Sequence, residues 1–262
     1  MSFNDKNYLI DVMDGRLYKY QKDTFNLILF ADAASYNKSG NKSMYAIFSE
    51  IVELPPILRH AAENTIFHSS WSHSNPDFNI YLEKYNSELD TLIKNGIEID
   101  GRVFKFKIHL LMCDKPAQCK VCKFTNFNGK YGCIKCMHPT IYTSKTVYPT
   151  LETVNNFYEM ENLKNKDKIS YKKKEPLKEI SLRSNEMYRK QAIEAERDEI
   201  VNFGVQGYAK ISDWILIPDR VYYGMMHMTD IGTWKWLFNS LFDSENKYKI
   251  FYLGNKKNLH IL

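Results

Sequence analysis

The sequence lacks any apolar run long enough to cross a bilayer. Its first residues, MSFNDKNYLIDVMDG, also lack the apolar segment of a secretory signal. We therefore expect an intracellular protein, nuclear or cytoplasmic, with no membrane partner. Thiols stay reduced in those compartments, so the five cysteines are candidates for metal binding rather than for disulfides.

A strong charge bias is absent as well. The chain carries 36 Lys and Arg against 31 Asp and Glu, a formal net charge of +5, which permits a polyanionic partner without identifying one. Basic residues gather between positions 164 and 190, where Lys172, Lys173 and Lys174 form a run. Such a stretch is either a solvated linker or a flexible basic segment that contacts phosphates of a nucleic acid.

Apolar patterning predicts a mixed α/β domain. Strands are expected at residues 25–32, 43–54, 64–71 and 102–114, a helix at 78–95, a turn and strand at 13–20, a charged helix at 184–200, and an amphipathic helix at 233–242. The order of three strands, a helix and a further strand favours an α/β domain around a mixed sheet. We expect an extension at 1–24, a core at 25–145, a charged helical and basic segment at 146–200, and the C-terminal part of the core with its terminal helix at 201–262.

Two aspartates follow apolar strands. Asp32 comes after NLILFA, and Asp114 comes after IHLLMC. If the two strands are neighbours, both carboxylates lie at one edge of the sheet, where ligands and catalytic groups collect in open α/β sheets. Such a pair suits Mg²⁺ or Mn²⁺. Alternatively, each aspartate only ends its strand and begins a turn.

Two CxxC pairs, CKVC and CIKC, are separated by ten residues. Cys119, Cys122, Cys133 and Cys136 at this spacing are typical of a tetrahedral Zn²⁺ site. The alternative is a helical turn at PAQCKVCKF in which Cys119 and Cys122 are small buried residues.

Three stretches occur in order along the chain. LFADAASYNKSGNKSMYAIFSEIVELPP contains a strand with an aspartate and a small polar turn, a second strand after Asn-Lys-Ser, and Leu-Pro-Pro. LLMCDKPAQCKVCKFTNFNGKYGCIKCMHP contains Asp-x-Pro-Ala, Phe-Asn-Gly and Gly-Cys-x-x-Cys, and MMHMTDIGTWKWLF contains Met-His followed by a glycine. Together they resemble the core of CACTA/EnSpm-type DNA transposases over roughly residues 25 to 255.

The resemblance implies an RNase H-like mixed sheet flanked by helices, with a small cysteine knuckle at residues 113–138. It implies DNA as the partner and acidic residues with a divalent metal for strand cleavage and transfer. Asp32 matches the first catalytic aspartate of the family, and Asp114 matches the second. Cys133 and Cys136 match the knuckle cysteines and would share Zn²⁺ with His138 or His227. Cys119 and Cys122 lie where the family generally lacks cysteines.

One departure bears on activity. Alignment of His227 with the family's Asp-x-Met-His motif places Gly224 where the family has an aspartate. Whether that aspartate is a metal ligand is open; if it is, Asp219 and Asp230 are the nearest substitutes, and both are out of register. We therefore expect a transposase-derived domain with impaired catalysis, from a transposon remnant or a partial reading frame. The alternatives are a zinc-stabilised, non-catalytic nucleic-acid-binding module and a metal-dependent nuclease, and homo-oligomerisation is open in each.

Overall fold

The computed structural model describes residues 11–35, 43–72, 76–166, 168 and 172–224. The chain divides into two compact units, Met1–Val221 and Tyr222–Leu262, and the second is described only at residues 222–224. Among the described residues, no helix is both long enough and apolar enough to span a membrane. The predicted helix at 233–242 lies outside the described residues.

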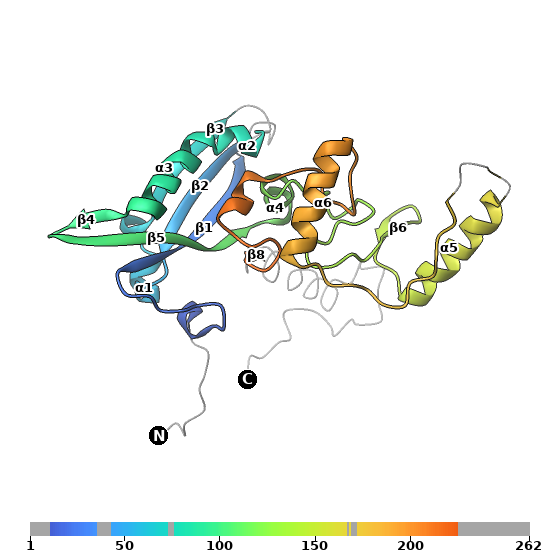
Figure 1. Cartoon of the computed structure of the whole chain (residues 1–262), viewed down its shortest axis with the longest axis horizontal. Coiled ribbons are helices and arrows are strands. Elements are labelled where there is room, and N and C mark those ends of the chain that lie inside the picture. Colours follow the sequence, from blue (N-terminus) through green and yellow to red (C-terminus); the bar gives the residue numbers. More distant parts are fainter. Residues whose placement is uncertain (1–10, 36–42, 73–75, 167, 169–171, 225–262) are drawn as a thin grey trace, which may run out of the picture. The chain divides into compact units, whose positions relative to one another are not determined.

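A mixed sheet forms the centre of the first unit (Figure 1). Its strands, in the part of the chain that the structure describes, are β1 (Thr24–Ser35), β2 (Ser43–Ile51), β3 (Ile66–Ser72), β4 (Ile97–Ile99) and β5 (Arg102–Cys113), together with β8 (Val221–Tyr223), which begins at the last residue of this unit. Their order is β3-β2-β1-β5-β4, and β8 also pairs with β5. β1 is antiparallel to β2 but parallel to β5. The expected α/β class with a mixed sheet is thus confirmed.

Apolar residues occur at successive positions of β1 because both faces of the strand are covered. Leu29 and Ala31 belong to the main core, whereas the intervening Ile28 belongs to a smaller cluster on the opposite face. Residues of the N-terminal segment, among them Val12 and Leu17, pack against that smaller cluster. The two faces of the sheet are therefore covered by different parts of the chain.

Six helices flank or follow these strands in the described ranges. They are α1 (Pro56–Arg59), α2 (Phe78–Tyr81), α3 (Glu83–Asn95), α4 (Lys115–Val121), α5 (Leu151–Asn165) and α6 (Asn185–Asp198). α3 runs along one face of the sheet (Figure 1) and buries Leu89 in the main core. Gly96 ends α3 with φ of 76°, and a Cβ at this position would lie 2.4 Å from the Phe104 carbonyl oxygen. The close passage of β5 thus requires glycine here.

A separate small core lies around α5. Ile141 of β6 (Ile141–Tyr142), together with Val154 and Tyr158 of α5, forms a buried cluster against which Leu177 packs. β6 pairs with β7 (Thr146–Val147) in a short antiparallel hairpin. Thr150 caps α5 by accepting a hydrogen bond from the Thr153 backbone N–H. The charged segment after residue 146 is therefore partly ordered by its own apolar contacts.

Several predicted elements differ from the structure. Residues 13–20 contain a turn after a short 3₁₀ helix at Val12–Asp14, but the predicted strand is wrong, because this segment packs its apolar side chains on the sheet without joining it. The predicted helix at 78–95 is divided at Leu82 into α2 and α3. The strand predicted at 25–32 continues to Ser35.

Candidate functional site

Asp32 lies inside β1 rather than at its end. The parallel pairing of β1 with β5 ends at Ala31 and Cys113, whereas the antiparallel pairing with β2 continues beyond Asp32 to Ser35. Asp32 is therefore not a strand stop, and that simpler interpretation is wrong. It is the first residue of β1 beyond the parallel ladder, opposite Ala46 of β2.

Asp114 directly follows β5 and begins α4. Its carboxylate accepts a 2.7 Å hydrogen bond from the backbone N–H of Ala117, as an N-cap residue does. Pro116 occupies the first turn of α4, where a missing N–H costs no helical hydrogen bond. Asp114 therefore follows the end of its strand, as the simpler interpretation expected, but it begins a helix rather than a turn. A ligand role is compatible with this position, because only one carboxylate oxygen accepts a hydrogen bond.

The two aspartates share one edge of the sheet. Each is the residue after the last parallel pair, Ala31 with Cys113. Burial raises the pKa of the Cys113 thiol, and the charges of Cys122, Asp114, Cys119 and Asp32 raise it further, so both carboxylates act on this one side chain. Neighbouring parallel strands thus bring together two acids that are far apart in sequence.

The sheet face that carries Asp32 is only partly covered. Phe30, two residues before Asp32, stacks on Phe48 with ring centroids 4.9 Å apart, and side chains two residues apart lie on the same face of a strand. Phe30 and Met112 line a pocket of about 450 Å³ that also contacts Arg59. By strand geometry the Asp32 backbone lies about 7 Å further along the same face. The pocket thus lies on the same face of the strand as Asp32, although neither acid lines it.

Among the described residues, each carboxylate makes one hydrogen bond. Ala33 donates its backbone N–H to Asp32 Oδ1 over 2.7 Å, and Ala117 donates to Asp114 Oδ1. The second oxygen of each acid has no partner within the described ranges. Two carboxylates fit a hard divalent cation that retains part of its water shell, because Mg²⁺ commonly takes one or two carboxylates and completes its coordination with water and substrate phosphates.

A third acid does not join them in the described part of the chain, where no group of three His, Cys, Asp or Glu side chains is placed to hold a metal ion. Asp219 is exposed, and the next residue, Arg220, accepts a backbone hydrogen bond from Leu111, three residues before Asp114. Gly224 follows β8. Asp230 and His227 lie outside the described residues.

Cys119 and Cys122 are buried at the end of α4. Cys122 has no exposed surface and belongs to the main core, and the Cys119 thiol donates a 3.4 Å hydrogen bond to the Thr125 carbonyl oxygen. Burial raises the pKa of both thiols. These two cysteines are small core residues of a helix, as the alternative to a four-cysteine site predicted.

Cys133 and Cys136 are half-buried in the loop that follows Gly132. Cys136 forms a backbone bridge with Leu182, which holds the loop against the segment before α6. Burial raises the pKa of the Cys136 thiol, and the neighbouring Arg183 charge opposes this rise. His138 packs on the Tyr148 ring, and its buried Nε2 atom has no hydrogen-bond partner among the described residues. These three side chains do not form a ligand group within the described ranges.

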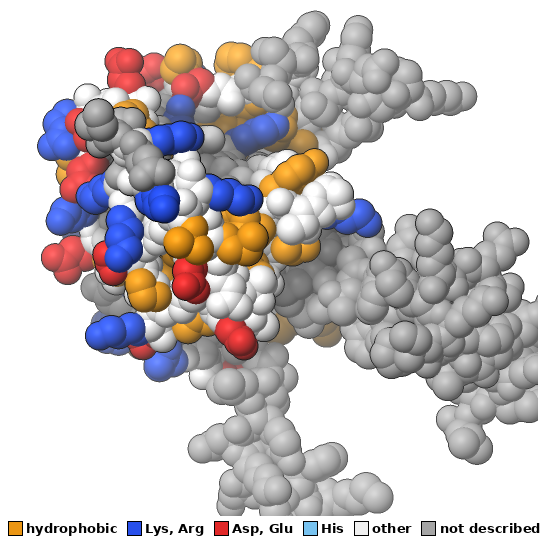
Figure 2. All heavy atoms as spheres, turned by 90° about the vertical axis from the view of Figure 1, so that its right-hand side faces the viewer, with side chains coloured by type: hydrophobic (Ala, Val, Ile, Leu, Met, Phe, Trp, Pro, Cys, Tyr) orange, Lys and Arg blue, Asp and Glu red, His pale blue; other side chains and the backbone are white. Residues whose placement is uncertain are grey.

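The lysine run is not uniform. Lys172 and Lys173 are exposed, whereas Lys174 is half-buried and forms an ion pair with Glu161. On the face viewed from the side of α5, Lys and Arg side chains are interspersed with Asp and Glu, and hydrophobic side chains lie among them (Figure 2). That face therefore has mixed charge rather than one continuous basic patch.

Sequence reasoning did not identify the residues around the acid pair. Ala46 and Phe48 of β2 lie opposite Asp32 and Phe30. The alternation of β2 indicated that these two residues share a face, but the pairing register that places them beside the acid depends on contacts between strands.

No family model matches the chain. Two curated relatives are proteins named "Uncharacterized protein ORF1", one from Spiroplasma virus SpV1-R8A2 B and one from Spiroplasma virus SpV1-C74. Each is 26% identical over 165 residues, which make up 60% of this chain and 21% of the viral protein. The chain thus spans about a fifth of the length of the curated relatives that it matches, and their names state no activity.

Proposed function

We propose that the chain is a transposase-derived RNase H-like domain whose ancestral activity is metal-dependent DNA strand cleavage and transfer, and that this activity is impaired here. The observation that supports it most directly is the parallel pairing of β1 with β5, after which Asp32 and Asp114 follow at one edge of the sheet. This is the placement that the resemblance to CACTA/EnSpm-type transposases requires of its first two acids.

The two aspartates would hold Mg²⁺ or Mn²⁺ through the oxygens that accept no hydrogen bond from the described chain. A bound ion of this kind orients water and neutralises charge on a phosphodiester. The chain itself positions the two carboxylates. The Ala117 N–H fixes the Asp114 carboxylate, and the small Ala46 side chain leaves room opposite Asp32. Impairment follows from the missing acid at Gly224 and from the exposed position of Asp219.

The test is Mn²⁺ binding and Mn²⁺-dependent cleavage by the full chain and by the isosteric variants Asp32→Asn and Asp114→Asn. We expect Mn²⁺ to bind the unaltered chain, each variant to lose that binding, and DNA cleavage to be slow or absent. Binding that both variants retain would refute a shared metal centre. The alternative, a metal-dependent nuclease, would be identified by rapid DNA cleavage that requires both aspartates and is not followed by strand transfer.

The third function, a zinc-stabilised nucleic-acid-binding module, has its own test. Purified chain would contain zinc, and it would bind duplex DNA with an affinity that falls steeply with salt and is unaffected by either aspartate substitution. Zinc below about a tenth of an equivalent would exclude a stabilising site of the Cys133–Cys136 type, since a structural zinc site is stoichiometric.

A further inference from the structure

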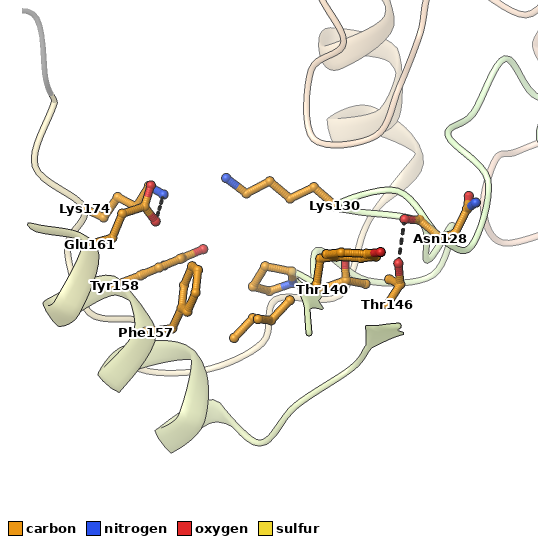
Figure 3. A pocket seen from close by; sticks show the side chains of 11 residues that line it. Asn128, Lys130, Thr140, Thr146, Phe157, Tyr158, Glu161 and Lys174 are labelled. Atoms are coloured by element: carbon orange, nitrogen blue, oxygen red, sulfur yellow. Dashed lines mark hydrogen bonds and ion pairs between the residues drawn. The ribbon is translucent and has the colours of Figure 1, made fainter. Parts of the chain in front are cut away.

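A second pocket, of about 330 Å³, is lined by neither Asp32 nor Asp114. It lies between α5, the β6–β7 hairpin and the loop that carries Lys130 (Figure 3). This volume is at the small end of the range for ligand pockets, about 300 to 1,000 Å³.

Two lysines and one glutamate line this pocket. Lys174 pairs with Glu161, and its ammonium lies 5.2 Å from the centroid of the Tyr158 ring. Lys130 makes no ion pair with any residue that the structure describes, and Figure 3 shows its ammonium pointing across the pocket toward the Lys174–Glu161 pair. Burial lowers the pKa of Lys130, the Lys174 charge lowers it further, and the Glu161 charge opposes this; the ammonium also lies 5.7 Å from the centroid of the Tyr131 ring. One positive charge is therefore left unbalanced where an anion could enter.

The positions of both lysines are fixed by backbone hydrogen bonds. The Asn162 side chain donates to the Lys174 carbonyl and accepts from its N–H, with distances of 2.7 and 2.9 Å. The Thr140 backbone N–H donates to the Lys130 carbonyl over 2.7 Å. Because the backbones at both ends of the pocket are held, the two lysines extend their side chains from fixed positions of the fold.

Aromatic surface completes the pocket. The Phe157 side chain is 42% exposed and lines the pocket, as does Tyr142, which is 76% exposed. Tyr158, by contrast, is buried in the small core around α5. An exposed ring beside a cationic site is the combination that binds unpaired bases, since every base has a face for stacking while its phosphate needs a counter-charge.

We propose that this pocket binds one nucleotide with an unpaired base, its phosphate between Lys130 and Lys174 and its base against Phe157. Such a nucleotide is supplied either by single-stranded DNA or by a free mononucleotide. The proposal goes beyond the metal centre and does not depend on it. A duplex is excluded as the source because its bases are stacked on one another.

The test measures binding of a short fluorescein-labelled oligodeoxythymidylate to the full chain, with thymidine monophosphate and inorganic phosphate as competitors. Lys130→Gln removes the free charge, and Phe157→Leu keeps an apolar side chain but removes the ring. Lys105→Gln is the matched control, because Lys105 is an exposed lysine of β5 that neither lines the pocket nor belongs to the basic segment at 164–190. We expect the first two substitutions to weaken binding at least about fivefold and the control to change it less than about twofold.

Unchanged affinity in Phe157→Leu would overturn the proposal, and so would equal losses in Lys130→Gln and Lys105→Gln. Displacement of the oligonucleotide by inorganic phosphate as readily as by thymidine monophosphate would also overturn it, since the base would then contribute nothing. A mononucleotide that binds as tightly as the oligonucleotide identifies the free nucleotide as the ligand, and a tighter oligonucleotide identifies the strand. The assay contains no divalent metal ion, so its outcome is independent of whether Asp32 and Asp114 form a metal centre.

Discussion

The Asp114 carboxylate accepts its hydrogen bond from the Ala117 backbone N–H and thereby begins α4. Asp114 thus stabilises a helix whether or not it binds metal. Alanine at this position would remove both the capping oxygen and the negative charge, so it cannot separate helix capping from metal binding. Asparagine retains a capping oxygen and loses only the charge.

We expect Asp114→Ala to lower the free energy of unfolding by about 1 kcal/mol and Asp114→Asn to lower it by less than about 0.5 kcal/mol. Urea denaturation of the two variants measures the difference. Equal destabilisation by alanine and asparagine would show that the carboxylate charge, rather than the cap, stabilises α4.

Stability should fall on mild acidification because of His109. Burial, followed by the charges of Arg220 and Lys107, lowers the pKa of this histidine to about 4. The unfolded chain binds a proton below its ordinary pKa of 6.5, and the folded chain does not until about pH 4. The free energy of unfolding therefore decreases as pH falls through this window, by at most about 1.4 kcal/mol per pH unit.

Urea denaturation at several pH values between 4 and 7 checks this slope, and His109→Gln should flatten it. Arg220 donates to the His109 carbonyl oxygen over 3.1 Å, a contact that does not involve the ring, so the variant keeps this anchor. An unchanged slope in the variant would assign the pH dependence to other groups.

The five cysteines should differ in reactivity. Cys113 and Cys122 are buried and their thiol pKa values are raised by burial, whereas Cys133 and Cys136 are half-buried. Only the thiolate reacts with iodoacetamide. Peptide mapping by mass spectrometry should find label first on Cys133 or Cys136 in the native protein and on every cysteine in denaturant. Early labelling of Cys122 would contradict its place in the core.

Arg59 should be a major contributor to stability. Its side chain is 4% exposed, forms a two-pronged ion pair with Asp11, and donates to the carbonyl oxygens of Val52 and Leu54. Arg59→Ala leaves these groups unpaired and should lower the free energy of unfolding by about 3 kcal/mol. Thermal or urea denaturation measures this loss.

The exposed pair of Arg102 with Asp23 is the control for Arg59, since the Arg102 side chain is 60% exposed. Arg102→Ala should cost less than about 1 kcal/mol. Comparable losses in the two variants would mean that burial does not distinguish the pairs.

The long strands and helices could be predicted because each carries its own pattern. IHLLMC reads as a strand whatever its neighbours, and the Ser184 cap with Tyr188 and Ala192 one turn apart indicates α6. β4 could not be predicted, because Ile97 and Ile99 are both exposed and the three-residue strand exists only through its pairing with β5. The short apolar stretch DWILIP (213–218) forms no strand or long helix: it begins at the last residue of a 3₁₀ helix, Lys210–Asp213, and only Ile215, Ile217 and Pro218 are buried.

Asp32 and Asp114 could be identified as candidate metal ligands from the sequence, but their placement at one edge of the sheet could not be predicted with certainty. It depends on which strands pair, a choice made by contacts between distant segments. The pocket proposed to bind a nucleotide was still harder to predict from the sequence. Lys130, Phe157 and Lys174 belong to three separate segments, and no local spacing links them.

The parallel pairing of β1 with β5 also constrains how the chain folds. β1, β2 and β3 are joined by short connections and can pair early, but Ala31 meets Cys113 only when a loop of about eighty residues closes. Contacts of such long range form late and slowly. A nascent chain that ends before β5 therefore carries Asp32 without its companion, and the two acids come together only once this long loop has closed.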